Sequence, residues 1–428
     1  MRVLVVGQGA REHAICWKLR QSPHVKEIYA APGNAGIAQV ADCVGIGVAD
    51  IIELADFAEK LKMDLTVVGP ELPLTLGIVD EFQKRGLPIF GPSRLAAELE
   101  GSKVFSKEFM HKYEIPTAEA VVCSSTDEAK AALKKTKYPA VIKVEGLAAG
   151  KGVVIVQSLK EAAEYFHLVF EVKKFGNAAN RILVEEYLEG EEVSFMVITD
   201  GKKFVPLAPA KDYKKANDGD TGPNTGGMGA HSPAVVLNGD TAGEIVKQIM
   251  LPTIQGMAEE GRSYSGCLYA GLILTRKGPK VLEYNCRFGD PETQVQMLRL
   301  EDDLAELLLK VANGDLEDTK LSWKKEAAAC VVVAVKGYPG EYPKGQEVVI
   351  DPIGEDGVVL FHAGTVKKGE KLVNVAGRVI SVCAHAPTLT EALAKTYRAV
   401  PKIRFEGATY RRDIGYRALE QRKQAVGE

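Results

Sequence analysis

The chain has 428 residues, of which 46% are hydrophobic and 26% charged, and this composition excludes disordered, collagenous and low-complexity classes. At about 100–200 residues per domain, the length suggests about three domains. The 54 basic and 57 acidic residues nearly balance, which argues against a protein that binds nucleic acid by neutralising phosphates. No apolar run reaches about 18 residues, so we expect no membrane partner. The seven cysteines form no C-x-x-C pair, which favours a cytoplasmic protein over a disulfide framework or a zinc site.

The first hundred residues alternate between short apolar runs and helical stretches. The expected strands are 2–6, 27–31, 64–68 and 88–90, and the clearest helical stretches are 51–62 and 75–86. This alternation predicts a doubly wound parallel sheet with helices on both faces, a Rossmann-like substrate domain over residues 1–102. The chain begins with a strand and a glycine turn, which is not the pattern of a signal peptide.

The turn GQGAREH follows the first expected strand. Gly7 and Gly9 would let the backbone approach a phosphate at a helix N-terminus, although a purely structural turn is the alternative. Glu12 stands where a dinucleotide fingerprint has its third glycine, and no acidic residue ends the second strand, so NAD binding is not expected. His13, on the helix after this turn, is a further candidate site residue.

A strand, a glycine-rich loop and a second strand are expected in YPAVIKVEGLAAGKGVVIV, between two helices opened by capping boxes at Ser125 and Ser158. The spacing of Gly146 and Gly150 is one residue too short for a P-loop, and a strand follows instead of a helix. We therefore expect a mobile loop whose backbone N–H groups fold over phosphates. Lys143 lies in the strand before the loop and is expected to bind phosphate, although an edge position facing water is the alternative.

Two acidic patterns follow. RILVEEYLEGEEVSF ends a strand in an elbow that could hold an adenine edge and ribose hydroxyls, or could be a solvated turn. In KVLEYNCRFGDPE the strand period of two places Glu283, Asn285 and Arg287 on one face. Carboxylate and amide oxygens are ligands that Mg²⁺ takes together with substrate phosphates, and an arginine beside them would hold a transferring phosphoryl group.

Residues 206–233 form a long Gly-, Asp-, Asn- and Pro-rich stretch, which we interpret as a functional or disordered loop. Asp212, Asp218 and Asp220 in this stretch could orient an amine. After Trp323 the pattern changes to antiparallel strands and a helix opened at Thr388, which predicts a small mixed domain over residues 326–428.

The order of lysine strand, glycine loop, acidic elbow and Glu-x-Asn resembles the ATP-grasp fold. Within that fold the chain resembles the phosphoribosylamine–glycine ligase (glycinamide ribonucleotide synthetase) family over nearly its whole length. The similarity is carried by G-x-G-x-REHA, APGNAG, VVGPELPL, GLAAGKGV, EEYLEGEEVS, GPNTGGMGAHSP, E-x-NCRFGDPETQ, FHAGT and YRRDIG. The resemblance implies an α/β and α+β multidomain protein, with an ATP-grasp region over residues 103–325 and a lid subdomain at about 120–192.

The resemblance also implies the activity and the site. ATP would drive the joining of glycine to 5-phosphoribosylamine, with Mg²⁺ or Mn²⁺ as one or two ions, in de novo purine biosynthesis. Nucleotide ligands would be Lys103, Lys143, Gly146, Gly150, Gly152, Glu185, Glu186, Leu188 and Glu192, and the metal pair Glu283 and Asn285. Substrate ligands would be Gly9, Gly33, Asn34, Asp212, Gly227, Arg287 and Asp290, of which Asp212 and Arg287, with Lys143, would be catalytic. The partners would be these small molecules, and a monomer is compatible with the sequence, which leaves the oligomeric state open.

The departures from the family pattern are Gln8 and Ala10 in the first turn, KDYKK and Asn217 in the long loop, Glu145, and Cys286. They leave the substrate role of residues 213–217 least defined. The main alternative is a sister ATP-grasp purine enzyme that acts on bicarbonate or formate. An NAD oxidoreductase and a non-catalytic nucleotide-binding regulator are the other classes considered.

Overall fold

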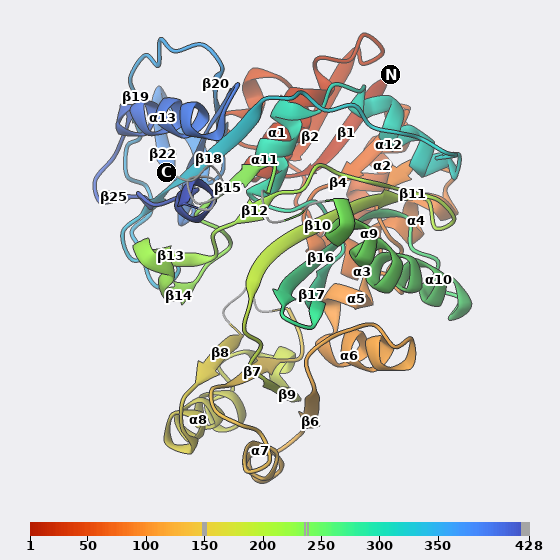
Figure 1. Cartoon of the computed structure of the whole chain (residues 1–428). Helices are drawn as coiled ribbons and strands as arrows, with labels where there is room; N and C mark the ends of the chain where they lie inside the picture. Colours follow the sequence, from red (N-terminus) through yellow and green to blue (C-terminus); the bar gives the residue numbers. More distant parts are fainter. Residues whose placement is uncertain (148–151, 235–236, 238, 421–428) are drawn as a thin grey trace.

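The computed structural model describes residues 1–147, 152–234, 237 and 239–420. These residues form four larger sheets. One four-stranded sheet with its helices lies below the rest of the molecule (Figure 1). Within the described residues, no helix is both long and apolar enough to cross a membrane. The mixed α/β architecture predicted from the sequence is confirmed.

The first domain is built on a parallel five-stranded sheet in the order β3-β2-β1-β4-β5. Its strands are β1 (Arg2–Gly7), β2 (Glu27–Pro32), β3 (Asp42–Cys43), β4 (Leu65–Val68) and β5 (Ile89–Phe90), and its helices α1 (Ala10–Leu19), α2 (Ile51–Lys60), α3 (Glu71–Leu76) and α4 (Ile78–Lys84). The expected helix over 75–86 is wrong in one respect: it is two helices. They meet at Gly77, whose φ of +94° is a left-handed conformation that ends α3.

Two short helices lead to the lid subdomain, the part of the chain from β6 to β9. The helices are α5 (Glu98–Gly101) and α6 (Lys103–Lys112). The lid sheet has the order β6-β9-β7-β8 and is antiparallel: β6 (Ala120–Cys123), β7 (Ala140–Val144), β8 (Val153–Val156) and β9 (Ile182–Glu186), with α7 (Thr126–Leu133) and α8 (Leu159–Phe166). Ser125 and Ser158 cap the two helices as predicted, each accepting a hydrogen bond from the backbone N–H three residues on. The buried core of this subdomain comes only from residues 123–184, so the lid packs as a unit of its own.

The larger subdomain carries an antiparallel sheet in the order β11-β10-β16-β17. Its elements are β10 (Glu191–Thr199), β11 (Phe204–Pro206), β16 (Gly266–Thr275), β17 (Gly278–Asn285), α9 (Gly239–Ile245), α10 (Leu251–Glu259), α11 (Glu292–Arg299) and α12 (Leu304–Asn313). Strand β10 begins directly after the lid and is long enough to link the lid to the body (Figure 1).

The C-terminal domain has an antiparallel sheet in the order β12-β15-β18-β23-β20, with β25 paired to β18. Its elements are β12 (Lys211–Asp212), β15 (Gly229–Ser232), β18 (Ala327–Val335), β20 (Val358–His362), β23 (Arg378–Ala386), β25 (Ala408–Thr409) and α13 (Leu389–Ala399). Short two-stranded pairs surround it: β13 (Lys215–Asn217) with β14 (Thr221–Asn224), β19 (Val349–Ile350) with β24 (Ile403–Arg404), and β21 (Thr365–Lys368) with β22 (Lys371–Asn374).

The prediction of an irregular loop over 206–233 is wrong, because this stretch contains four short strands. Two of them, β12 and β15, join the C-terminal sheet across the predicted boundary at residue 326. Strand β15 pairs with β18, about a hundred residues further along the chain, and β12 pairs with β15. Local composition does not reveal a partner at that distance.

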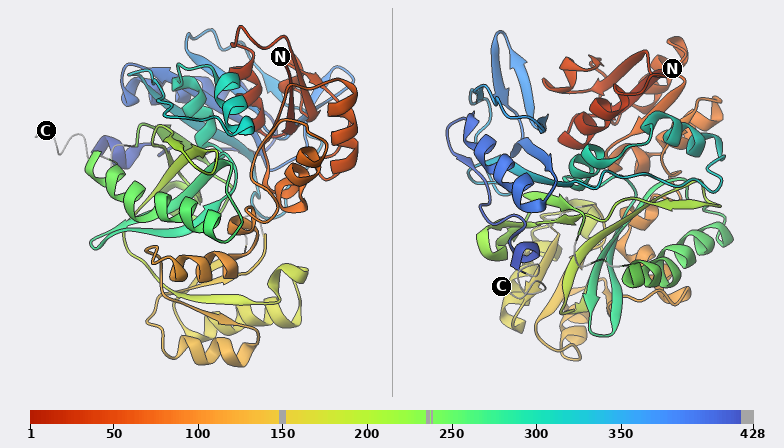
Figure 2. Two further views of the ribbon diagram at one scale, coloured as in Figure 1. Left: turned by 90° about the vertical axis from the view of Figure 1, so that its right-hand side faces the viewer. Right: turned by 45° about the horizontal axis from the view of Figure 1, so that its top comes forward.

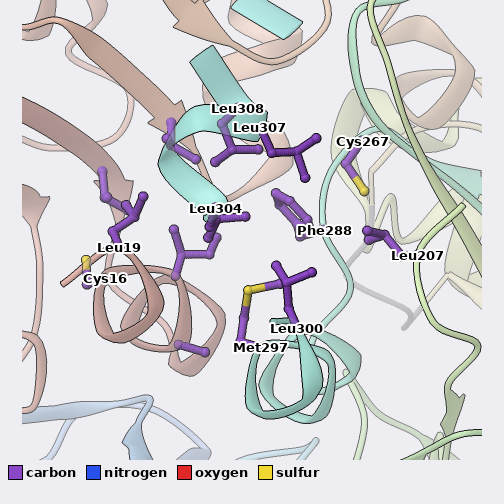
Figure 3. Packing of buried hydrophobic residues seen from close by; sticks show 14 of the residues in the cluster. Cys16, Leu19, Leu207, Cys267, Phe288, Met297, Leu300, Leu304, Leu307 and Leu308 are labelled. Atoms are coloured by element: carbon purple, nitrogen blue, oxygen red, sulfur yellow. The ribbon is translucent and has the colours of Figure 1, made fainter. Parts of the chain in front are cut away.

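Two apolar cores join the first domain to the larger subdomain, and one of them contains Phe288. Phe288 packs beside leucines of α12 and residues of α1 and α11 (Figure 3). Its ring stacks on Phe90 of the first domain with centroids 5.6 Å apart. The left view of Figure 2 shows the lid below this packed body. These cores therefore fix the first domain against the body, whereas the lid has a buried core of its own.

Candidate active site

Lys143 links the lid to the body at the cleft between them. It lies on β7, is 7% exposed, and its Nζ donates to the backbone oxygen of Leu282 on β17 at 3.0 Å. The same ammonium group lies 2.8 Å from a carboxylate oxygen of Glu185 on the neighbouring strand β9. The lysine therefore points toward Glu185 and β17. It does not face water from an edge position.

Lys107 is a second lysine at this carboxylate, and the sequence analysis missed it. Its Nζ lies 3.2 Å from the other oxygen of Glu185. Burial opposes ionisation of Glu185, but the two ammonium groups prevail and lower the pKa of its carboxyl. Lys107 is one helical turn after Lys103 on α6, and that spacing could have identified it.

Lys103 approaches the glycine loop from the other side. Its Nζ donates to the backbone oxygen of Gly146 at 3.2 Å, and burial lowers the pKa of the lysine, with Lys143 adding to the effect. The departure Glu145 forms an ion pair with Arg181 at the base of the loop. Gly152 accepts a hydrogen bond from the Val144 N–H at 2.9 Å. Gly150 lies outside the described residues.

The acidic elbow connects β9 to β10, as expected for a hinge. A carboxylate oxygen of Glu186 accepts from the Glu119 N–H at 3.1 Å and from Lys280 Nζ at 3.2 Å, which ties the lid to β17. Leu188 is half-buried in the elbow. Desolvation, together with the carboxylates of Asp212 and Glu283, raises the pKa of Glu192.

The expected metal pair lies at the end of β17. On β16, Gly271 lies opposite Glu283 and Tyr269 lies opposite Asn285. The bulge in β17 is at Leu282, before both residues, so Glu283 and Asn285 keep the regular strand spacing. Lys214 Nζ lies 3.1 Å from Glu283 Oε1 and is the main reason that the pKa of Glu283 is lowered to about 2. Asn285 is 8% exposed, and no hydrogen bond to its amide occurs within the described part of the chain. An ionised carboxylate that already holds a cation, beside an unpartnered buried amide, fits a hard divalent ion.

A buried acidic cluster lies next to this pair. Glu292 Oε1 accepts hydrogen bonds from Tyr269 at 2.5 Å and from Ser194 at 2.9 Å. The Ser194 hydroxyl is also 3.4 Å from Asp212 Oδ1. Burial raises the pKa of Glu292, and the nearby Asp212 carboxylate raises it further. This cluster places the carboxyl groups of Asp212 and Glu292 on either side of the Ser194 hydroxyl, next to the expected metal pair.

The other two aspartates proposed for an amine are not in the cleft. Asp220 forms an ion pair with the buried Arg411 at 2.8 Å, and Asp218 accepts from the Arg412 N–H at 2.8 Å. These bonds attach the β13–β14 hairpin to the C-terminal YRRDIG segment. Asp218 and Asp220 are therefore structural, and only Asp212 of the three faces the site.

Arg287 lies beyond the end of β17 and is held by two carboxylates. Its guanidinium is 3.1 Å from Glu100 and 3.4 Å from Glu71 of the first domain. Glu100 also accepts from the Cys286 N–H at 2.7 Å. These contacts indicate that Arg287 joins the first domain to the larger subdomain. They argue against direct contact between Arg287 and a phosphoryl group.

The glycine turn of the first domain, at Gly9, lies near Asp290 of the larger subdomain. A Cβ atom on Gly9 would lie 3.8 Å from Asp290 Oδ2 and 2.8 Å from Glu12 Oε2. The Glu12 carboxylate already accepts from the Gly9 N–H at 2.5 Å, and it lies where a third glycine would leave space. A protein carboxylate thus occupies part of the helix N-terminus at which a substrate phosphate was expected.

A C-terminal arginine supports this part of the cleft. Arg378 on β23 forms an ion pair with Asp290 at 2.8 Å and donates to the backbone oxygen of Gly226 at 2.7 Å. A Cβ atom on Gly227 would lie only 2.5 Å from Pro291. Asp290 and Gly227, both predicted to be substrate ligands, are therefore adjacent and fixed by a residue that the sequence analysis did not single out.

Asn34 and His13 hold the C-terminal domain. The Asn34 side-chain amide donates to the backbone oxygens of Gln8 at 2.8 Å and His362 at 2.7 Å. Its oxygen accepts from the N–H groups of Gly36 and Ile37, at 2.8 and 2.9 Å. His13 accepts from the His362 N–H at 2.9 Å, and burial lowers its pKa to about 3. Gly33 turns the chain here with φ +73°.

The chain matches three models of one protein family. It matches "Phosphoribosylglycinamide synthetase, N domain" over residues 1–100, "ATP-grasp (A) domain" over 101–293 and "C domain" over 328–417. The phosphoribosylamine–glycine ligase of Vibrio cholerae is 46% identical over 423 residues, 98% of this chain and 99% of that protein. The chain belongs to the phosphoribosylamine–glycine ligase family. The ligase of Escherichia coli K12 is 47% identical over 426 residues, with 98% and 99% covered.

Solved structures agree with this family assignment. The crystal structure of the Thermotoga maritima phosphoribosylamine–glycine ligase matches with a TM-score of 0.84 and 36% identity, covering 97% of this chain and 100% of that one. A biotin carboxylase domain from Hydrogenobacter thermophilus matches with a TM-score of 0.74 at 17% identity, covering 96% and 91%, which shows a shared fold only. The family resemblance seen in the sequence is confirmed, and the sister enzyme acting on bicarbonate or formate is not favoured.

Proposed function

We propose that this protein uses ATP to join glycine to 5-phosphoribosylamine, giving glycinamide ribonucleotide, ADP and phosphate. The observation that supports it best is that Lys103, Lys143 and Lys107 gather near β17, the strand that carries Glu283 and Asn285. This arrangement occurs in a chain that matches the family from end to end. The substrates are small molecules, and cytoplasmic location and the monomeric state stay predictions.

The lysines would bind the ATP phosphates, and the lid would close over them through the loop at Gly146–Gly152. The elbow at Glu185, Glu186 and Leu188 would hold the adenine through backbone groups, because the Glu185 side chain is engaged by lysines. Glu192, at the start of β10, would accept the ribose hydroxyls.

Glu283 and Asn285 would hold Mg²⁺ or Mn²⁺, which supplies neutralisation of charge on the phosphoryl group in transfer. Asp212 and Glu292 would hold the ammonium group of glycine. With the ammonium group held there, the glycine carboxylate would point to the transferred phosphoryl group. Preorganised charges of this kind stabilise a developing transition state without rearrangement.

The amine of phosphoribosylamine would then attack the carbonyl of glycyl phosphate and release phosphate. The C–O bond to phosphate breaks, the C–N bond forms, and the amine loses a proton. We propose that Gly9, Gly227 and Asp290 shape the site of this second substrate, with Arg287 and Asn34 acting by holding the domains around it.

Omission of substrates tests the reaction. ADP release should require ATP, glycine and phosphoribosylamine together, and replacing glycine by bicarbonate or formate should abolish it. Release that continues with formate in place of glycine would contradict the proposal.

Isotope transfer tests the intermediate. With ¹⁸O in the glycine carboxylate, one labelled oxygen should appear in the released phosphate, because the carboxylate oxygen bonds to phosphorus in glycyl phosphate. Unlabelled phosphate would exclude this route.

A further inference from the structure

Lys214 places a positive charge on the carboxylate that we assign to the metal. Its Nζ is 3.1 Å from Glu283 Oε1, and the carboxylates of Asp212 and Glu192 also act on its charge. The side chain is about one-quarter exposed, so the contact is at the cleft wall and not a fully solvated surface pair.

The backbone under Lys214 is fixed. Its carbonyl oxygen accepts from both the N–H and the hydroxyl of Thr225, each at 2.8 Å. The preceding residue, Tyr213, exchanges backbone bonds with Met228 and Gly229 at 2.8 and 3.0 Å. The GPNTGGMGA segment therefore holds Lys214 against Glu283, and only its flexible side chain is free to move.

A divalent ion that enters without nucleotide would be repelled by the positive charges around Glu283. Glu283 is already paired, and Lys143 and Lys103 add further positive charge to its surroundings. Phosphates of a bound nucleotide would neutralise these lysines and offer Lys214 another anion. The Asn285 amide, which has no partner in the described residues, would then complete the oxygen ligands with Glu283.

We propose that the Lys214 ammonium occupies the cation position at Glu283 in the free protein and yields it only when metal arrives with the nucleotide. The inference rests on the proposed function, because it takes Glu283 as the metal ligand. A merely structural ion pair would behave differently: losing it would not strengthen binding of metal alone.

The test measures Mn²⁺ binding to the nucleotide-free protein through the electron paramagnetic resonance signal of free Mn²⁺. Lys214→Met should bind Mn²⁺ about tenfold more tightly or better than the unaltered protein, since a unit charge near the site is lost. Lys214→Arg, which keeps the charge, should retain the weaker binding. Lys215→Met removes a neighbouring positive charge that is not at Glu283 and is the matched control, with little expected change.

A double variant makes the result specific. In Glu283→Gln, adding Lys214→Met should give no gain in Mn²⁺ affinity, because the shared ligand is gone. Unchanged or weaker Mn²⁺ binding by Lys214→Met would overturn the proposal, as would an equal gain without Glu283. If Lys214→Met fails to fold by circular dichroism, Lys214→Gln is read in the same way.

The Mn²⁺ titration needs neither glycine nor phosphoribosylamine, so its outcome is separate from that of the ligase assay. Ligase activity with unchanged Mn²⁺ affinity in Lys214→Met would refute only the role of Lys214. A gain in Mn²⁺ affinity without ligation of glycine would refute only the proposed reaction.

Discussion

At the scale of single residues, the metal pair makes the sharpest prediction. Glu283→Gln keeps the shape of the side chain and removes its charge. Turnover should fall by about 10²-fold or more, as for other lost electrostatic contacts to a transition state. Steady-state kinetics at saturating Mg²⁺ measure this, with Glu355→Gln as control, because Glu355 forms an ion pair on the C-terminal domain with Arg398. Near-normal turnover in Glu283→Gln would remove this residue from the site.

Residue types at short spacing allowed part of the site to be predicted. Lys143 before a glycine loop and Glu283 two residues from Asn285 are local patterns, and the structure places them at one cleft. Lys214 was not predicted to touch Glu283, because 69 residues separate them and only the fold joins them. Arg287 was predicted to face a phosphoryl group, but Glu71 and Glu100 come from the first domain and α5, and no local pattern indicates those carboxylates.

At the scale of elements, the loop between β14 and β15 depends on one position that requires glycine. Gly227 has φ +111° and a Cβ there would lie 2.5 Å from Pro291. Gly227→Ala should destabilise the protein by about 1–3 kcal/mol and raise KM for phosphoribosylamine, because both the backbone strain and the clash are unfavourable. Chemical denaturation and kinetics measure the two effects.

Gly278→Ala is the control that separates strain from clash. Gly278 has φ +103° but nothing within 4 Å of a built Cβ, so it should show strain with little kinetic change. Equal kinetic effects from both substitutions would argue against a special role for the contact between Gly227 and Pro291.

Elements formed by regular periodicity were predicted well. The alternation of apolar runs and helices gave the parallel sheet of the first domain, and Ser125, Ser158 and Thr388 begin helices as their capping patterns indicate. The segment 206–233 was interpreted as a loop because its strands are only two to four residues long and rich in glycine. Strand β15 forms by tertiary pairing with β18, and β12 then pairs with β15, whereas β13 and β14 pair with each other. Single-sequence propensity cannot show a pairing partner as distant as β18.

At the scale of the whole molecule, two histidines lie between the first and C-terminal domains. The pKa values of His13 and His362 are lowered to about 3 and about 4, both by burial and that of His13 also by the charge of His362. In the unfolded chain histidine takes up a proton near pH 6.5. Between pH 6.5 and about 4 the unfolded state therefore binds more protons, and stability should fall as the pH is lowered.

His13→Asn tests this pH dependence, because asparagine can accept the same hydrogen bond without titrating. Its unfolding free energy should vary less steeply with pH than that of the unaltered protein between pH 6.5 and 4. His24→Gln, at an exposed histidine beside Glu306, should leave the slope nearly unchanged. An unaltered slope in His13→Asn would show that this buried histidine does not control acid stability.

The position of phosphoribosylamine is also a question for the whole molecule, because three domains meet where we place it. Gly9 comes from the first domain, Asp290 from the larger subdomain, and Arg378, 2.8 Å from Asp290, from the C-terminal domain. We place ATP separately, between the lid and the larger subdomain. Glu12 fills part of the helix N-terminus, so backbone N–H groups at this turn cannot bind the substrate phosphate alone. Arg378 keeps the facing Asp290 neutralised.

Valine at Gly9 would push into this junction, since even a Cβ atom there would lie 2.8 Å from Glu12 Oε2. Gly9→Val should therefore raise KM for phosphoribosylamine by roughly tenfold to 10²-fold, the effect of misplacing a substrate by about 1 Å, and leave KM for ATP nearly unchanged. Gly45→Val is the matched control, because Gly45 is in the same domain and a Cβ there meets nothing within 4 Å. If Gly9→Val instead raises KM for ATP alone, the assignment of the two phosphate sites is wrong, and the first-domain turn serves the nucleotide.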